Sequence, residues 1–239
     1  FFVVLGLSCF IATLGLLADN TVTVIGAMLI APLMKPIMAI AYGLVLRDGS
    51  LVVRAAFKLA LGIAATLAVA AATEWLFGLR GATQQILVRT HPTRVDLGVA
   101  VAAGVAATMA AIRPNIAEAL PGVAVAVALV PPLCVTGVSL SLGEWSLMWG
   151  AGLLFGINLF AIFFCAVLVF VLEGFGDWRR ASPGLIVVGL VLVALSVPLR
   201  GSLQVIRLDD VVQEVIEDYL RAHYEAHEAI HPDDLRHVA

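Results

Sequence analysis

The chain has 239 residues, of which 62% are hydrophobic and 13% are charged, with a mean hydropathy of +1.05 and a formal net charge of −3. A water-soluble domain carries about 25% charged residues, and several apolar runs here reach the roughly 20 residues that cross a bilayer. These properties exclude a soluble globular domain, and the slight negative charge gives no support for nucleic-acid binding. We therefore predict an all-α integral membrane protein whose main partner is the lipid bilayer.

About seven apolar segments follow one another between short polar breaks. They cover approximately residues 1–17, 21–46, 51–77, 96–112, 115–142, 147–172 and 183–199. From them we predict a transmembrane domain over 1–199, built of repeat one over 1–78, repeat two over 96–173 and an extra span over 183–199. Each repeat has three segments, with a proline-containing segment in the middle. Because three crossings reverse the direction of the chain, two such units would form an inverted repeat of three plus three, as in many secondary transporters.

The second segment holds the first of two proline-broken stretches. It follows Asn20 and reads IGAMLIAPLMKP from Ile25 to Pro36. Proline has no backbone N–H and clashes with the preceding helical turn, so Pro32 and Pro36 predict an interrupted helix. In a bilayer, a carbonyl that loses its donor must be satisfied by protein or by trapped water. The break is therefore a candidate site for a solute or ion, or alternatively a kink that only shapes the bundle.

Lys35 lies immediately before the second of these prolines. An ammonium at bilayer depth costs roughly 2.5–3.5 kcal/mol on insertion scales, so it normally faces a cavity or a partner. The functional hypotheses are an anion-binding charge, or an ion pair with Asp19, Glu74 or Glu118. The alternative is that the break lies near the membrane interface and that Lys35 snorkels to the headgroups.

The fifth segment holds the second proline-broken stretch, VAVALVPPLC, from Val125 to Cys134. Its LVPPL motif, which contains Pro131 and Pro132, aligns with LIAPL in the first stretch. A half-helix over 123–130 would be about 12 Å long and would end in mid-membrane with unpaired carbonyls suited to a cation. The half-helix that follows would present N–H groups suited to an anion, so the sequence does not choose the charge of the ligand. Paired broken segments of this kind point to a solute or ion site.

Two further polar residues accompany the proline stretches. Asn158 lies in the middle of the sixth segment, and Glu118 lies near the start of the fifth. Asn158 either hydrogen-bonds another helix or lines the pathway beside the prolines. Glu118 is either an interfacial carboxylate or a proton-coupled one. Both are functional candidates, because polar groups at bilayer depth are costly.

The fourth segment carries small residues at four-residue spacing. Gly98, Ala102, Ala106 and Ala110 fall on one helical face. Such faces let helix backbones approach closely in lipid. We therefore expect this face to serve helix packing, and we expect the protein to be a homo-oligomer.

Basic residues in the short loops predict the orientation of the spans, because cytoplasmic loops carry an excess of Lys and Arg. Under seven crossings, one side carries Arg47, Arg54, Lys58, Arg113, Arg179 and Arg180, whereas the other carries Arg80, Arg89 and Arg94. This imbalance places the N-terminus in the cytoplasm and the C-terminal tail outside.

Residues 200–239 form a separate, water-facing tail with four basic and nine acidic residues. Within it, the stretch 203–222 has apolar residues at helical spacing and predicts an amphipathic helix. Its polar face lacks the Lys and Arg that bind anionic lipid, so we expect protein contacts. His223, His227 and His231 fit a solvated helical face better than a zinc site.

Several motifs in this chain are shared with a known family. They are VIGAMLIAPLM from Val24, RTHP from Arg89, LPGVAVA followed by LVPPLC from Leu120, and LFGINL from Leu154. Over about residues 15–172 the chain resembles the uncharacterised prokaryotic "hydrophobic domain" membrane family, the domain of unknown function three-eight-nine. The resemblance implies a multi-pass protein of the prokaryotic inner (plasma) membrane, often with a cytoplasmic domain before the first span. It implies no established substrate.

The leading functional hypothesis is a transporter or channel for a small solute or ion, with its site between the stretches 26–36 and 121–134. The predicted site residues are Lys35, Pro32, Pro36, Asn20, Glu118, Pro131, Pro132 and Asn158. The alternative is a non-transporting membrane scaffold or sensor that works through oligomerisation and partner binding. No nucleophile elbow, phosphate loop or dinucleotide fingerprint occurs in the sequence, so we predict no enzymatic activity, no cofactor and no metal site.

Overall fold

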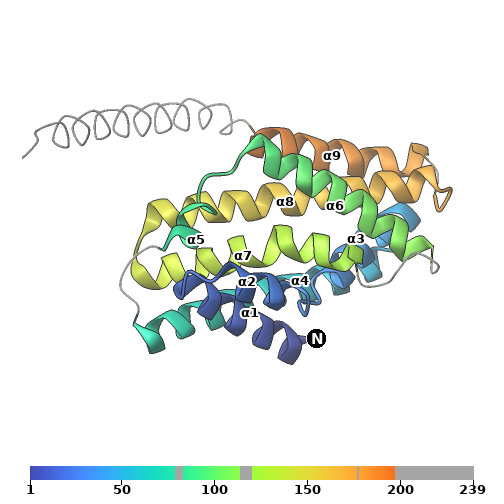
Figure 1. The fold of residues 1–239 in the computed structure, drawn as a ribbon. Helices are drawn as coiled ribbons and strands as arrows, with labels where there is room; N and C mark the ends of the chain where they lie inside the picture. The colour runs from blue at the N-terminus through green and yellow to red at the C-terminus, as the bar shows by residue number, and fades with distance from the viewer. Residues whose placement is uncertain (79–82, 114–119, 177, 197–239) are drawn as a thin grey trace, which may run out of the picture. The chain divides into compact units, whose positions relative to one another are not determined.

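The computed structural model describes residues 1–78, 83–113, 120–176 and 178–196, and the regular structure in this part is entirely helical (Figure 1). The helices are α1 (Phe2–Leu17), α2 (Thr21–Met28), α3 (Met34–Leu46), α4 (Gly49–Phe77), α5 (Gln84–Leu87), α6 (Arg94–Ile112), α7 (Leu120–Leu142), α8 (Trp145–Leu172) and α9 (Trp178–Ser196). The all-α prediction is thus confirmed for these residues. Glu118 and the predicted acidic tail, with its helix and its histidines, lie outside the described residues.

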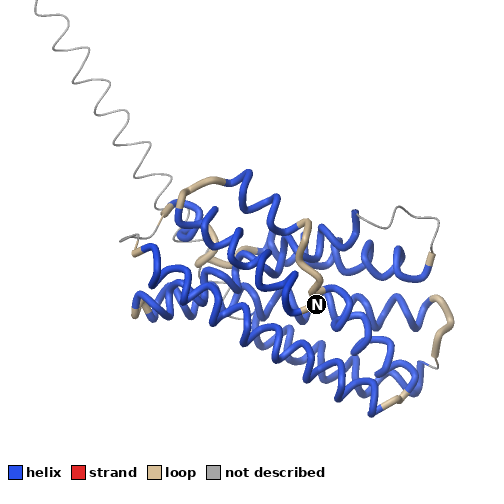
Figure 2. The backbone as a smooth tube through the Cα atoms, turned by 90° about the horizontal axis from the view of Figure 1, so that it is seen from below, coloured by secondary structure: helices blue, strands red, loops and turns tan. Residues whose placement is uncertain are grey.

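The longer helices run along one common direction (Figure 2). Three of them, α4, α6 and α8, are long and apolar enough to cross a bilayer, and shorter apolar helices accompany them, including α1 and α3. Many large apolar side chains lie on the outside, among them Val22, Phe57 and Trp149. Apolar side chains over so much of a surface are suited to lipid rather than water. The chain is therefore a helical membrane protein.

Hydrogen bonds near the loops define one end of the helix bundle, which we call the α5 end. Here α5 lies against the last turn of α1, because the Thr83 hydroxyl donates to the Leu16 carbonyl at 2.7 Å. α4 and α7 also finish at this end, since the Ser141 hydroxyl donates to a Glu74 carboxylate oxygen at 2.6 Å. At the opposite end, Arg113 after α6 forms an ion pair with Glu173 after α8, with 3.0 Å between nitrogen and oxygen.

Polar side chains explain where several helices begin, since the first four N–H groups of a helix have no partner within it. Asn20 caps α2, because its Oδ1 accepts the Thr23 N–H at 3.0 Å. Asp48 caps α4 in the same way, accepting the Leu51 N–H at 3.0 Å. That bond, together with hydrogen bonds from Ser50, holds the pKa of the exposed Asp48 carboxyl below its usual range. Asn20, a predicted site residue, thus performs a capping role.

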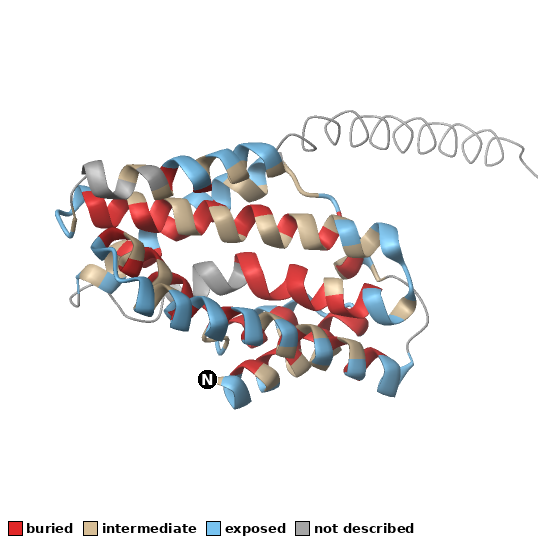
Figure 3. Cartoon of the chain, turned by 180° about the vertical axis from the view of Figure 1, so that it is seen from behind, coloured by how far each residue is buried: buried red, intermediate tan, exposed pale blue. Residues whose placement is uncertain are grey.

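α8 is the most buried of the three long helices, and α3, α6, α7 and α9 all pack against it. Buried residues accordingly line the inward sides of the helices (Figure 3). α7 also lies close to α4, where a Cβ added at Gly137 would come within 2.7 Å of the Ala70 Cβ. A glycine at such a contact lets two membrane helices approach closely.

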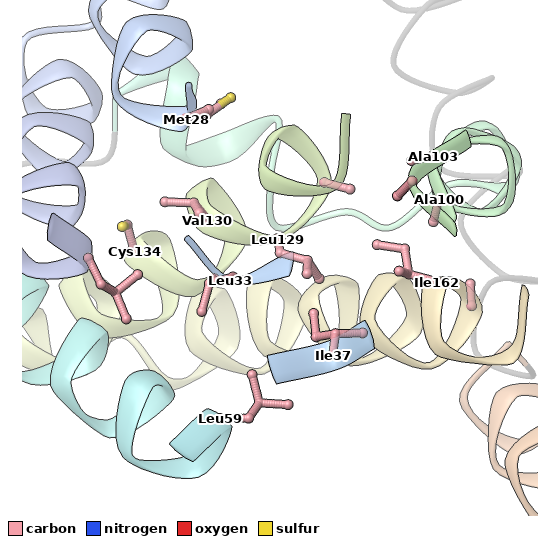
Figure 4. Close-up of a cluster of buried hydrophobic side chains, with 14 of the residues drawn as sticks. Met28, Leu33, Ile37, Leu59, Ala100, Ala103, Leu129, Val130, Cys134 and Ile162 are labelled. Atoms are coloured by element: carbon pink, nitrogen blue, oxygen red, sulfur yellow. The ribbon is translucent and has the colours of Figure 1, made fainter. Parts of the chain in front are cut away.

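The two proline stretches meet in an apolar cluster (Figure 4). Met28 and Leu33 from the first stretch are buried in the same cluster as Leu129, Val130 and Cys134 from the second. The sequence placed the solute site between these stretches. The structure instead places packed hydrophobic side chains there.

At the first stretch, α2 ends at Met28 and α3 begins at Met34, with turns between them. The carbonyl of Ala27, near the end of α2, has two donors of its own. The Ile30 N–H donates to it at 3.2 Å, and the Ser8 hydroxyl of α1 donates to it at 2.7 Å. Protein groups therefore satisfy this carbonyl, as the bilayer interior requires.

At the second stretch, α7 continues through both Pro131 and Pro132. The predicted half-helix that ends at Val130, and the second that starts near Leu133, are therefore not observed. The physical reason lies in α8, which supplies a replacement donor for one carbonyl that proline leaves without its partner. That contact belongs to the candidate site described below.

The predicted face of small residues on α6 points away from the neighbouring helices. Its members are exposed or half-buried: Gly98, Ala102, Ala106 and Ala110. A different face packs inward, where a Cβ added at Gly104 would lie 2.9 Å from the Ile162 Cα of α8. Within the described chain, close packing of α6 therefore uses Gly104 rather than the predicted set.

Candidate solute-binding cavity

A cavity of about 200 Å³ lies between α6, α7, α8 and the loop that follows α5. Its lining combines two charged residues, one amide and several apolar residues: Val88, Arg89, Asp96, Val99, Ala128, Pro132, Leu154 and Asn158. The charged residues belong to the α5 end of the bundle. Asn158 and Pro132 lie farther inward, with about 20 Å of helix between the start of α8 and Asn158. The cavity therefore joins the α5 end to the middle of the bundle.

Asn158 supplies the hydrogen-bond donor that Pro132 removes from helix α7. A proline removes the N–H that would bond to the carbonyl four residues earlier, which for Pro132 is the Ala128 carbonyl. The Asn158 side-chain NH₂ donates to this carbonyl at 2.8 Å. This bond between helices explains why α7 continues through the proline pair.

The oxygen of the same Asn158 side chain, Oδ1, is an acceptor without a hydrogen-bond partner among the described residues. Asn158 is 3% exposed. A buried polar atom of this kind is unfavourable unless a ligand or water reaches it. Asn158 also lines the cavity, so the cavity is the side from which an N–H or O–H donor, or a cation, would reach this acceptor.

Arg89 supplies a positive charge near the outer part of the cavity. Its Nη1 donates to the Gln85 carbonyl at 2.6 Å and to Gln85 Oε1 at 2.9 Å. Burial lowers the pKa of the Arg89 guanidinium, although arginine stays charged in proteins. No carboxylate among the described residues forms an ion pair with it. The remaining N–H groups of Arg89 are therefore available to an acceptor on a ligand.

Asp96 supplies a negative charge, but much of its hydrogen-bonding capacity is already used. Its Oδ2 accepts the N–H of Thr93 at 2.8 Å and the Thr93 hydroxyl at 2.7 Å, while the Asp96 N–H donates back to that hydroxyl. This reciprocal arrangement is a capping box at the start of α6. Asp96 thus fixes the position of α6 beside the cavity, and its carboxylate stays within the cavity lining.

Gly150 allows the loop with Arg89 to lie against α8. A Cβ added at this position would overlap the Thr90 carbonyl oxygen. No other residue type has so small a side chain, so glycine is required for this approach. The packing of Thr90 on α8 in turn holds its neighbour Arg89 at the cavity.

The structure brings together only part of the predicted site. Asn158 and Pro132 line the same cavity, and Pro131 is buried beside it in α7. Pro32 is half-buried in the turn between α2 and α3. Lys35 and Pro36 line a different cavity, described below.

Of the ion pairs proposed for Lys35, those with Asp19 and Glu74 are not observed, and Glu118 lies outside the described residues. Asp19 accepts the Gln85 N–H at 2.9 Å, and Glu74 accepts the Ser141 hydroxyl. Among the described residues, the ion pair between Arg113 and Glu173 is the only one. Lys35 itself is exposed. Lys35 therefore plays no part in the lining of the Asn158 cavity.

Sequence reasoning missed Arg89 and Asp96 as site residues. Both lie at segment ends, where charges usually face the interface, and nothing local indicates that the loop folds back over α8. A signal was nevertheless present in the loop motif RTHP, which begins at Arg89. Binding residues are disproportionately found on loops that a rigid scaffold positions, so a charged loop motif between apolar segments was the available signal.

The helices and the cavity define a class: a helical membrane protein with a partly polar cavity between its helices. The chain matches the family described as Domain of unknown function (DUF389) over residues 28–164, which is more than half of its length. It belongs to that family, and the predicted resemblance is confirmed. Every residue that lines the cavity falls within the matched range.

One curated relative is an uncharacterized protein of the archaeon Methanocaldococcus jannaschii. It is 27% identical over 173 residues, which cover 72% of this chain and 54% of the relative. The chain thus spans about half the length of the curated relative it matches. No solved structure matches the chain.

Proposed function

We propose that the protein is a transporter or channel for a small polar solute or ion, and that the Asn158 cavity is its binding site. The observation that carries this proposal is the Asn158 Oδ1, which has no hydrogen-bond partner among the described residues and is buried half-way along α8 beside Pro132. An orphaned acceptor in a bilayer is costly. Polar residues that face a cavity at membrane depth commonly mark substrate or ion pathways.

The helix contacts support a multi-pass arrangement with an inverted repeat. α1 and α4 contact each other and each contacts part of the α2–α3 unit, and α6, α7 and α8 contact one another in the same way. Between the two sets, α4 packs on α7 and α3 packs on α8. If α1, α2–α3 and α4 are exchanged with α6, α7 and α8 in that order, the contact between α4 and α7 corresponds to the contact between α8 and α3. On this basis we propose seven crossings, with α2 and α3 together forming one and α9 forming the last.

The distribution of basic residues supports an orientation in a prokaryotic inner membrane. Arg47 and Arg113 lie at the end opposite α5, whereas Arg89 and Arg94 lie at the α5 end. With the further basic residue Arg54 near the start of α4, the end opposite α5 is the more basic one, which favours a cytoplasmic location for it. The Asn158 cavity then faces the outside in this conformation.

Flux and charge movement in proteoliposomes test the proposal, with small anions, cations and weak acids as candidate solutes. The decisive variant is Asn158→Leu combined with Pro132→Ala, because the alanine N–H restores a donor to the Ala128 carbonyl while the cavity loses its free acceptor. We expect this variant to stay folded and to lose flux. A matched pair, Arg89→Gln and Arg94→Gln, removes one charge inside and one outside the cavity, and only the first should reduce flux.

Flux that persists in the double variant would contradict the proposed site. Absence of flux for every solute would favour the second candidate function, a membrane scaffold that works through oligomerisation. One observation favours that candidate: the small-residue face of α6, which includes Gly98 and Ala102, is exposed in the described chain. Such a face is suited to close contact with a helix of another subunit.

A further inference from the structure

A second cavity, of about 530 Å³, lies between the first turns of α3 and the first half of α4. Three of the residues that line it are cationic, Lys35, Arg54 and Lys58, and none is acidic. Its apolar lining includes Leu51 and Phe1. We propose that this cavity binds the phosphate of an anionic phospholipid headgroup. The proposal is independent of the proposed transport function, because the two cavities share no residue.

The two cations on α4 are held next to each other by their helix. Arg54 and Lys58 are four residues apart and therefore lie on the same helical face. Like charges at this spacing destabilise a helix, and a bound anion would relieve that repulsion. Arg54 is oriented by Ser50, since its Nε donates to the Ser50 carbonyl and its Nη2 to the Ser50 hydroxyl, both at 3.1 Å.

No carboxylate in the part of the chain that the structure describes neutralises the three cations. Among the described residues, none of them forms an ion pair. Asp48, at the start of α4, accepts hydrogen bonds from Ser50 and Leu51 as a helix cap. Lys58 lies with its Nζ 5.9 Å from the centre of the Phe1 ring, a contact that neutralises no charge. The cavity therefore keeps a concentrated positive charge.

The position of this cavity points to lipid as the source of the phosphate. α3 and α4 are joined by a short turn at the end opposite α5. About 14 Å of α4 separates that end from Lys58, and about 17 Å of α3 separates it from Lys35. This depth corresponds to the headgroup region and the adjoining hydrocarbon of one leaflet. Basic pockets between membrane helices on the cytoplasmic side are sites for anionic headgroups. The volume is within the range of small-molecule sites.

The test uses the full chain in a neutral detergent, with bound lipid counted by native mass spectrometry. The probes are phosphatidylglycerol, phosphatidylcholine with the same acyl chains, and inorganic phosphate. We expect retention of phosphatidylglycerol over phosphatidylcholine, and affinity about thirtyfold weaker in Lys35→Gln/Lys58→Gln. The matched control, Arg47→Gln/Arg94→Gln, removes two positive charges elsewhere and should bind normally. Lys35→Arg/Lys58→Arg keeps the charge and should also bind.

Equal retention of the two lipids, or unchanged binding in the glutamine double variant, would overturn the proposal. Inorganic phosphate as a probe distinguishes a lipid phosphate from a free phosphate ion as the group that this cavity binds. Phosphate that raises the thermal unfolding midpoint, in the absence of any effect of phosphatidylglycerol, would overturn the assignment to lipid in favour of a free anion. Because Lys35 is exposed, its replacement by glutamine is not expected to prevent folding.

Discussion

Asn158 and Pro132 depend on each other, although they belong to different helices. The proline leaves the Ala128 carbonyl without its usual donor, and the Asn158 amide donates to it at 2.8 Å. The Asn158 Oδ1 has no hydrogen-bond partner in the described part of the chain. One side chain thus holds α7 to α8 and also belongs to the lining of the cavity.

Replacement of Asn158 by leucine should therefore destabilise the protein by leaving the Ala128 carbonyl without a donor. We expect the free energy of unfolding to fall by about 1–3 kcal/mol, measured by detergent-induced unfolding in lipid micelles. In the same background, Pro132→Ala should recover most of the loss, because the alanine N–H can donate to that carbonyl. Additive losses in the double variant would contradict this linkage.

At the scale of secondary structure, the loop after α5 is the element that completes the cavity. It lies close to α8 only because Gly150 has no side chain beside the Thr90 carbonyl. The neighbouring Gly152 has more room, since a Cβ there would lie 3.9 Å from the Thr136 side chain. Substitution of Gly150 therefore tests the contact between the loop and α8, and substitution of Gly152 in the same helix is its control.

Gly150→Ala should push the loop away from α8, because overpacking a close contact costs about 1–3 kcal/mol. The displaced loop would expose Arg89, so trypsin should cleave there faster than in the unmodified protein. Gly152→Ala should leave both the cleavage rate and the thermal midpoint nearly unchanged. Identical cleavage in the two variants would show that Thr90 does not pack as described.

The two proline stretches show how far the sequence predicts these elements. The motif LIAPL, residues 29–33, forms the connection between α2 and α3, whereas LVPPL lies within the continuous helix α7. The two motifs are alike in local sequence, since each contains proline in an apolar run. The difference comes from Asn158, which approaches from another helix. Helix type and approximate bounds follow from periodicity, but the partner of a freed carbonyl depends on tertiary packing.

For the whole molecule, the helical class and the membrane environment follow from composition, whereas the location of the site does not. The predicted site lay between the proline stretches, where Leu33 and Val130 are packed in an apolar cluster. The observed cavity needs Arg89 and Asn158 to come together from distant parts of the sequence. Such long-range proximity cannot be read from spacing in a single sequence.

The packing of α1 against α7 gives a direct test of the helix arrangement. Cys9 and Cys134 are both fully buried, and their sulfur atoms are 3.4 Å apart. Iodine, a small membrane-permeable oxidant, should join them into a disulfide, whose sulfur atoms need to approach to about 2.05 Å. Mass spectrometry of peptides should detect a Cys9–Cys134 link and none in Cys9→Ser. A link from Cys9 to Cys165 instead would contradict the arrangement.

If the Asn158 cavity is a binding site, water and solutes must reach it as far as Asn158, and cysteine accessibility measures this access. In a background with Cys9, Cys134 and Cys165 replaced by alanine, Leu154→Cys and Ile162→Cys place thiols at two buried positions of α8. Leu154 lines the cavity and is 4% exposed, whereas Ile162 is fully buried in the core cluster. A small charged methanethiosulfonate reagent should modify Leu154→Cys and spare Ile162→Cys. Equal modification of both, or of neither, would contradict a solvent-filled cavity.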